Sequence, residues 1–277
     1  MKNPTWTRLT EWMREGKLPR REFIRQATLL GLAAPAAYSL AGLAQPARAQ
    51  SLPRGGTLTM AMRVMDVSNP HAISFDEGGF PIRVCVDHLT RTAQDNITRP
   101  WLLQGWEVSD DLRTWTLNLR PDVNWANGRP FTSEDVAWNV NRVLDPATGS
   151  SILGLMSGYM LNEIDTGETD EDGNPVMSSE LWDANAIEVV DDTTVRLNLK
   201  AAETAVPEHL FHFPFYMLDP EEGGTYGVGS NGTGPYTLVE HAVGEIAVME
   251  RRPGEHYSGQ GYLDRIVLTD LGEDASA

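Results

Sequence analysis

The stretch Trp106-Glu-Val-Ser-Asp-Asp-Leu-Arg-Thr-Trp-Thr-Leu-Asn-Leu-Arg120 decides the fold class of this 277-residue chain. In its second half, Trp115, Leu117 and Leu119 alternate with polar side chains, which is the period of a β-strand with one buried face. The four residues at its start predict a shorter strand, and Asp110-Asp111 predicts the turn between the two strands. The chain is therefore expected to build a sheet here, with one face in the core.

A helix is predicted directly after this stretch, over residues 131–144. Asn127-Gly128 is a strong turn signal before it. Thr132 is a suitable N-cap, and Asp135 stands three residues later, where a capping box places its acidic partner. Asp145-Pro146 ends the helix, because the residue before proline avoids helical geometry. The apolar face has helical spacing and comprises Val136, Val140, Val143 and Leu144.

The remaining sequence predicts more strands interspersed with helices, which favours a mixed α/β or α+β domain. A further helix is expected from Phe80 to Leu89, with Ile82, Val86 and Leu89 roughly on one face. The acidic, turn-rich stretch 161–180 is expected to be a surface insertion. The other predicted strands are residues 57–62, 187–190, 194–199, 235–240, 245–251 and 264–269.

The first 49 residues differ from the rest and resemble a twin-arginine export signal. Arg20-Arg21 precedes Phe23-Ile24-Arg25, a weakly apolar run covers residues 27–43, and Ala47-Arg48-Ala49 suits cleavage before Gln50. The alternative is a membrane anchor. The run is about 17 residues long and rich in Ala and Gly, which is at the lower limit for spanning a bilayer. A cleaved signal would export residues 50–277 to the periplasm.

Charge and cysteine content exclude several functions. The formal net charge is −17, and residues 50–277 carry 14 Lys or Arg against 36 Asp or Glu. Such an excess of negative charge argues against nucleic acid and anionic membranes as partners. Cys85 is the single cysteine, so an intramolecular disulfide is impossible. It lies in an apolar stretch and is expected to be a buried small side chain; activation by His88 is the weaker alternative.

Five short blocks, in order along the chain, resemble family 5 of the bacterial extracellular solute-binding proteins. These proteins are the dipeptide, oligopeptide and nickel receptors of ABC importers. The blocks are Gly55–Leu58, Trp106–Arg120, Asn127–Val136, Asn231–Tyr236 and Gly261–Ile266. The resemblance implies a fold like the type II periplasmic binding proteins. Because family members have two lobes and are longer, residues 50–277 are expected to form the first lobe only.

The resemblance also implies a binding function in which the chain catalyses no reaction. The chain would capture a peptide or similar small solute non-covalently and deliver it to the transmembrane subunits of a permease. It would act as a monomer, with no cofactor, metal or catalytic residue. Two alternatives remain open: a twin-arginine-exported enzyme with a bound cofactor, motivated by the export signal alone, and a lobe that binds nothing.

Ligand contacts are expected from loops at strand ends and from nearby aromatic side chains. Turn and cap chemistry is the competing explanation for most of these residue types. The predicted contacts are Met65, Asp66, Val67, Ser68 and Asn69 after the first strand, Gly232, Thr233 and Gly234 in the later turn, and the aromatic residues Trp125 and Tyr236.

Two patterns weakly suggest metal sites. Glu168, Asp170 and Asp172 have the spacing of a calcium loop, but the bidentate glutamate that such a loop needs is missing. His209 and His212 are three residues apart, without the H-E-x-x-H pattern of zinc proteases. Both patterns are better explained as a solvated acidic loop and as packing near an aromatic run.

Overall fold

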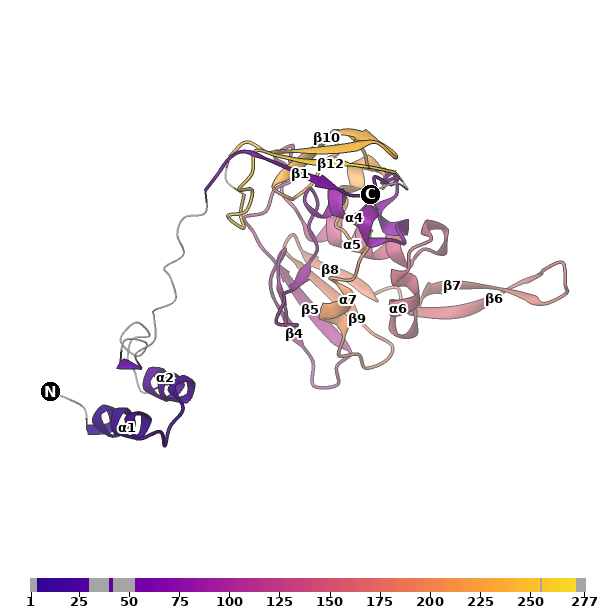
Figure 1. Ribbon diagram of the computed structural model, residues 1–277. Helices are drawn as coiled ribbons and strands as arrows, with labels where there is room; N and C mark the ends of the chain where they lie inside the picture. Colours follow the sequence, from indigo (N-terminus) through magenta and orange to yellow (C-terminus); the bar gives the residue numbers. More distant parts are fainter. Residues whose placement is uncertain (1–3, 30–39, 42–52, 255, 273–277) are drawn as a thin grey trace. The chain divides into compact units, whose positions relative to one another are not determined.

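The computed structural model describes residues 4–29, 40–41, 53–254 and 256–272. The chain divides into two compact units, Met1–Pro53 and Arg54–Ala277. We call them the N-terminal unit and the main unit and describe each by itself (Figure 1).

The N-terminal unit contains two short helices, α1 (Pro4–Arg14) and α2 (Arg20–Leu29). Leu9 and Phe23 are buried together with Ala27 and Ala41 in a small cluster. Most of the predicted apolar run 27–43 and the predicted cleavage site lie outside the described residues. No helix among the described residues has the length and hydropathy needed to cross a membrane.

The main unit is built on two four-stranded sheets. In the first, β1 and β12 are parallel and the other pairs are antiparallel. Its strands in sheet order are β1 (Thr57–Ala61), β12 (Arg265–Thr269), β11 (Ile246–Arg251) and β10 (Tyr236–Ala242). The second sheet is antiparallel, with the order β4 (Leu103–Val108), β5 (Thr114–Leu119), β9 (Thr194–Asn198) and β8 (Ile187–Asp191).

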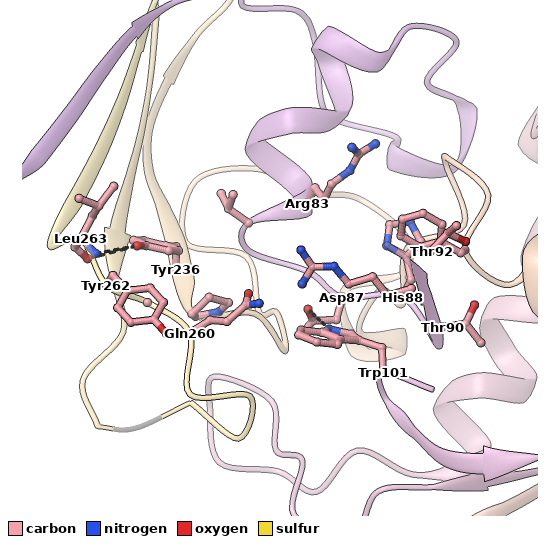
Figure 2. Close-up of a pocket in the computed structure, with 15 residues that line it drawn as sticks. Arg83, Asp87, His88, Thr90, Thr92, Trp101, Tyr236, Gln260, Tyr262 and Leu263 are labelled. Atoms are coloured by element: carbon pink, nitrogen blue, oxygen red, sulfur yellow. Dashed lines mark hydrogen bonds between the residues drawn. The ribbon is translucent and has the colours of Figure 1, made fainter. Parts of the chain in front are cut away.

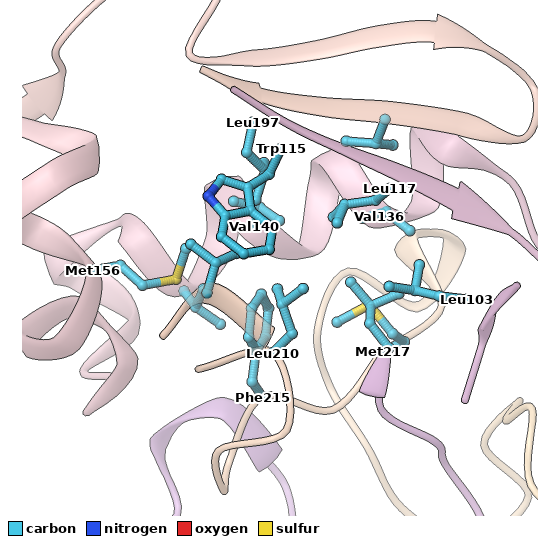
Figure 3. Packing of buried hydrophobic residues seen from close by; sticks show 14 of the residues in the cluster. Leu103, Trp115, Leu117, Val136, Val140, Met156, Leu197, Leu210, Phe215 and Met217 are labelled. Carbon is cyan, nitrogen blue, oxygen red and sulfur yellow. The ribbon is translucent and has the colours of Figure 1, made fainter. Parts of the chain in front are cut away.

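Helix α5 (Ser133–Leu144) covers the second sheet. The Asp135 carboxylate accepts the backbone N–H of Thr132 at 2.9 Å, which stabilises the start of the helix as the sequence predicts. Figure 3 shows Val136 and Val140 of α5 beside Trp115 and Leu117 of β5 in a buried cluster. Through this apolar contact, the helix packs as a layer on one face of the sheet. The helix α6 (Ile152–Met160) and the short α7 (Val206–His209) add further buried side chains to the cluster.

A second buried cluster lies under the first sheet and includes Leu238, Met249 and Leu268. The helix α4 (Asp76–Arg83) contributes Ile82 to it. A two-stranded ribbon, β2 (Thr90–Thr92) with β3 (Thr98–Pro100), follows. The two clusters together make the core of the main unit.

The acidic stretch expected to be a surface insertion is a hairpin of β6 (Leu161–Thr169) and β7 (Pro175–Leu181), with a register shift between Asp165 and Thr169. It extends away from α6 (Figure 1), and most of its residues are exposed. Asp170 accepts the backbone N–H groups of Asp172 and Asn174 at 2.9 and 2.8 Å. This carboxylate therefore serves the hairpin turn.

The helix predicted from Phe80 to Leu89 is wrong in its bounds, because α4 begins at Asp76 and ends at Arg83. The backbone of Leu89 is instead paired with the segment before β4. Its carbonyl accepts the N–H groups of Trp101 and Leu103 at 3.0 and 3.2 Å. Ile82, Val86 and Leu89 are all fully buried, although the helix ends at Arg83.

Two strands also differ from expectation. The alternation at residues 57–62 predicts a half-buried strand, but β1 lies at an edge of its sheet and is mostly exposed. The strand predicted over residues 106–109 begins earlier, at Leu103. Cys85 is 1% exposed, and burial raises the pKa of its thiol to about 12, so it is the inert buried side chain that the sequence predicts.

Candidate functional site

A pocket of about 570 Å³ opens where α4, β2, β10 and the segment before β12 meet. In Figure 2, Tyr236 and Tyr262 lie on one side of it, and His88 and Trp101 on the other. Its lining combines aromatic faces with polar groups, which is the composition typical of small-molecule sites. We call it the aromatic pocket.

Asp87 is a buried carboxylate that holds one wall of the aromatic pocket in place. It accepts hydrogen bonds from the indole N–H of Trp101 at 2.7 Å, from Tyr257 Oη at 2.9 Å and from Thr233 Oγ1 at 3.1 Å. Its own backbone N–H donates to Thr233 Oγ1 at 3.1 Å. A buried carboxylate needs such partners, and these bonds also connect the two halves of the core.

His88 borders the aromatic pocket and is 4% exposed. Its ring packs against Phe211 and Tyr216, with centroid distances of 5.2 and 4.6 Å. Burial lowers the pKa of His88 to about 3, so the ring is neutral at physiological pH. Within the part of the chain that the structure describes, Nε2 of this ring has no hydrogen-bond partner.

One of the predicted ligand contacts, Tyr236, lines the aromatic pocket, and four others lie in or beside the turn that leads to it. The Tyr236 hydroxyl donates to the carbonyl of Leu263 at 3.2 Å. Trp125 is fully buried and donates its indole N–H to Asp135 at 3.0 Å. The other three are Gly232, Thr233 and Gly234, which form the turn that carries the Thr233 hydroxyl to Asp87.

Both glycines of this turn pack directly on the main chain of Cys85. A Cβ on Gly232 would lie 2.1 Å from the carbonyl oxygen of Cys85, and one on Gly234 would lie 2.6 Å from its carbonyl carbon. No Cβ fits at either position, so the glycines are required for a close backbone approach. The two glycines, Thr233 and Trp125 thus have structural roles in the described chain.

The other five predicted contacts, Met65–Asn69, lie at the opposite end of the first sheet, after the carboxyl end of β1. Asp66 and Ser68 are exposed, and the Asp66 carboxylate accepts the backbone N–H of Ser68 at 3.0 Å. Hydrogen bonds from Ser68 lower the pKa of Asp66, so it is ionised. Val67 is buried and anchors the loop in the core.

Arg142 of α5 fixes the end of this loop. Its guanidinium donates to Asn69 Oδ1 at 3.0 Å and to the carbonyl of Gly224 at 3.2 Å, and it contacts Nδ1 of the buried His71 at 2.9 Å. His71 Nε2 lies 2.7 Å from the carbonyl of Tyr216. The structure therefore separates Met65–Asn69 from Tyr236, since the two lie at opposite ends of the first sheet.

Three residues that shape the pocket, Asp87, Trp101 and Tyr262, are not among the predicted contacts. Asp87 had a signal, since a charged residue inside the apolar stretch 82–89 must find partners when it is buried. Trp101 and Tyr262 had none, because the walls that they form come from distant segments. Among the described residues, no group of three His, Cys, Asp or Glu could hold a metal ion.

Comparison with known proteins identifies the family. The profile for bacterial extracellular solute-binding proteins, family 5 Middle, matches residues 98–277. A probable peptide ABC transporter periplasmic-binding protein of Sinorhizobium fredii is 28% identical over 87% of this chain and 43% of its own length. The nickel-binding periplasmic protein of Escherichia coli is 27% identical over 69% of this chain and 32% of its own length.

Solved structures show the same fold over most of the chain. NikA from Brucella suis, in complex with Fe(III)-EDTA, matches with a TM-score of 0.60 and 25% identity, over 77% of this chain and 39% of that one. A periplasmic oligopeptide-binding protein from Borrelia burgdorferi matches with a TM-score of 0.63 and 20% identity, over 81% and 44%.

The predicted family and mixed α/β fold are confirmed by these matches, and the chain spans less than half the length of each of these relatives. The match of residues 98–277 covers more than half of the sequence. The chain belongs to family 5 of the bacterial extracellular solute-binding proteins.

Proposed function

We propose that this chain belongs to the solute-binding component of an ABC importer and captures a peptide or similar small solute without chemical change. The family match over residues 98–277 carries the proposal. Relatives are named for binding dipeptides, oligopeptides and nickel, and the names of several place them in the periplasm. The shared property of these ligands is small size, and the partner that would receive the solute is the membrane permease.

The solute would contact the main unit at the loop Met65–Asn69. This loop follows the carboxyl end of β1, beside the carboxyl end of the parallel β12. Open α/β sheets bind ligands at that side of their strands. Asp66 is exposed and ionised, and Asn69 is held by Arg142. The loop thus presents the charged Asp66 side chain, and its backbone needs little further ordering when a ligand binds.

Export by the twin-arginine route to the periplasm, and action there as a monomer, complete the proposal. The Arg20-Arg21 pair, which begins α2, and the strongly negative composition of residues 50–277 support it. Export is tested by replacing both arginines with lysine and following the protein in periplasmic fractions. Loss of periplasmic protein supports the twin-arginine route, and undiminished export contradicts it.

Solute binding is tested by mutating the loop and measuring affinity. The double variant Asp66→Ala with Asn69→Ala is titrated calorimetrically with a panel of di- and tripeptides, beside the control Asp111→Ala. Asp111 lies in a comparable turn between β4 and β5 of the second sheet, where its carboxylate accepts the Ser109 hydroxyl at 2.6 Å. We expect at least a tenfold loss of affinity, about 1.4 kcal/mol, in the double variant alone. Equal affinities in the double variant and the control would refute this placement.

A further inference from the structure

The aromatic pocket lies at the other end of the first sheet from the loop Met65–Asn69. Tyr236 is the first residue of β10, and Leu263 stands just before β12. The loop follows the last residue of β1, which runs parallel to β12. Strands of five residues are about 17 Å long. A di- or tripeptide is shorter than this distance, since an extended chain spans about 3.3–3.6 Å per residue, so the pocket requires its own explanation.

The walls of the aromatic pocket favour a flat apolar group. Trp101 and Phe211 are half-buried lining residues. Figure 2 shows Trp101 on one side of the pocket and Tyr236 and Tyr262 on the other. A volume of about 570 Å³ is in the range of sites that enclose small organic molecules. Aromatic side chains arranged in this way stack against a ring in a ligand.

The charges at the pocket favour a negative group on that ligand. Arg83 and Arg91 both line it, and the guanidinium of Arg91 lies 4.7 Å from the centroid of the Trp101 ring. Asp87 is the one acidic residue among the described lining residues, and it already accepts three hydrogen bonds from protein groups. Guanidinium groups bind carboxylates with two parallel hydrogen bonds. The pocket is therefore locally positive on a chain of net charge −17.

His88 adds an independent observation. Its Nε2 is buried without a partner among the described residues, and its ring borders the pocket. Such an unsatisfied buried nitrogen is unfavourable, because it has given up water without gaining another partner. In the tautomer that carries its proton on Nε2, His88 can donate a hydrogen bond to a carboxylate that enters the pocket.

We propose that the aromatic pocket is a second ligand site, distinct from the solute loop, and that it binds a small carboxylate carrying an aromatic ring. The ring stacks between Trp101 and Tyr262, and the carboxylate binds Arg91 with Arg83 beside it. Occupation of this site would be independent of the imported solute, since the two places are at opposite ends of the sheet.

Fluorine NMR with 4-fluorophenylacetate tests the proposal, with 4-fluorophenylacetamide as the uncharged isostere. We expect saturable binding of the acid and at least tenfold weaker binding of the amide. Arg91→Met should weaken binding of the acid at least tenfold, while the exposed Arg113→Met should leave it unchanged. Similar binding of acid and amide, no binding at millimolar concentration, or an unaffected Arg91→Met variant would each overturn the proposal.

Two further measurements separate this site from the solute site. His88→Phe keeps the packing against Phe211 and Tyr216 but removes the nitrogen, so it should also weaken binding of the acid. The double variant Asp66→Ala with Asn69→Ala should bind the acid as the wild type does, and peptides should not displace it. Displacement by peptides would show that the pocket is the solute site itself and would overturn the claim of a second site.

Discussion

Replacing Gly232 by alanine should disrupt the turn that joins the two halves of the core. Gly232 is buried, and an added Cβ would lie 2.1 Å from the carbonyl oxygen of Cys85 and 3.4 Å from Val86 Cγ2. The nearest atom belongs to the backbone, so it cannot rotate away. The turn would have to move by about 1 Å to reach an ordinary contact distance.

The cost follows from two contributions. Forcing extra volume into a packed site costs about 1–3 kcal/mol. The same movement pulls Gly234 away from Cys85, whose carbonyl accepts its N–H at 2.8 Å, and losing that bond costs about 1 kcal/mol. The expected loss of unfolding free energy is thus about 2–4 kcal/mol. For a domain of this size, a loss of about 3 kcal/mol lowers Tm by about 6–12 °C.

Urea unfolding followed by tryptophan fluorescence measures this loss directly. Gly158→Ala is the matched control, because Gly158 lies in α6 and a Cβ added there would meet no atom within 4 Å outside its own helix. Alanine there should stabilise the protein by up to about 1 kcal/mol through helix propensity. If Gly232→Ala and Gly158→Ala had the same stability, close backbone contact would not be the reason for the glycine at position 232.

Three further predictions concern the buried groups Asp87 and His71 and the glycine that packs against Arg142. Asp87→Ala leaves the donors of Trp101, Thr233 and Tyr257 without their acceptor, so urea unfolding should show a loss of about 3–5 kcal/mol in unfolding free energy. Asp87→Asn should lose less. Equal stabilities of the wild type and Asp87→Ala would contradict the role of the carboxylate. Burial lowers the pKa of His71 to about 3, below its value of about 6.5 in the unfolded chain. Between these two pH values the unfolded state binds one more proton than the folded state. The free energy of unfolding therefore falls as pH falls, by up to about 1.4 kcal/mol per pH unit. His71→Gln should make this slope shallower in acid titrations of stability, and an unchanged slope would count against a neutral His71. Gly224→Ala would place a Cβ 2.1 Å from Arg142 Nε at a backbone φ of +85°. Because Arg142 supports the loop Met65–Asn69, calorimetry should show weakened peptide binding. The control Gly223→Ala, whose Cβ would meet no atom within 4 Å, should retain affinity.

The sequence predicted the elements whose residues alternate or carry a cap. Strand β5 follows from Trp115, Leu117 and Leu119, which are all buried in the core. Helix α5 follows from its capping residues and from Val136 and Val140. In each case local pattern and final burial agree, because one face meets one sheet or helix.

Other features could not be read locally. Val86 and Leu89 are buried at helical spacing, yet the chain there is not helical, because tertiary pairing with the segment at Trp101 determines its path. The hairpin β6–β7 is mostly exposed, so it has no apolar alternation to detect.

The candidate site shows the same limit. The solute loop follows from a strand end, which the sequence reveals. The aromatic pocket is assembled from residues between Arg83 and Leu263, and their meeting depends on the packing of distant segments. Tyr236 alone was predicted among its lining residues, as part of a turn motif.

Calorimetric titration of the protein with peptides, followed by chemical analysis of the recovered peptide, tests the central claim most directly. We expect saturable binding of one peptide molecule per chain, and we expect the peptide to be recovered intact. Cleavage or modification of the peptide, or no binding of any peptide or nickel chelate, would contradict it.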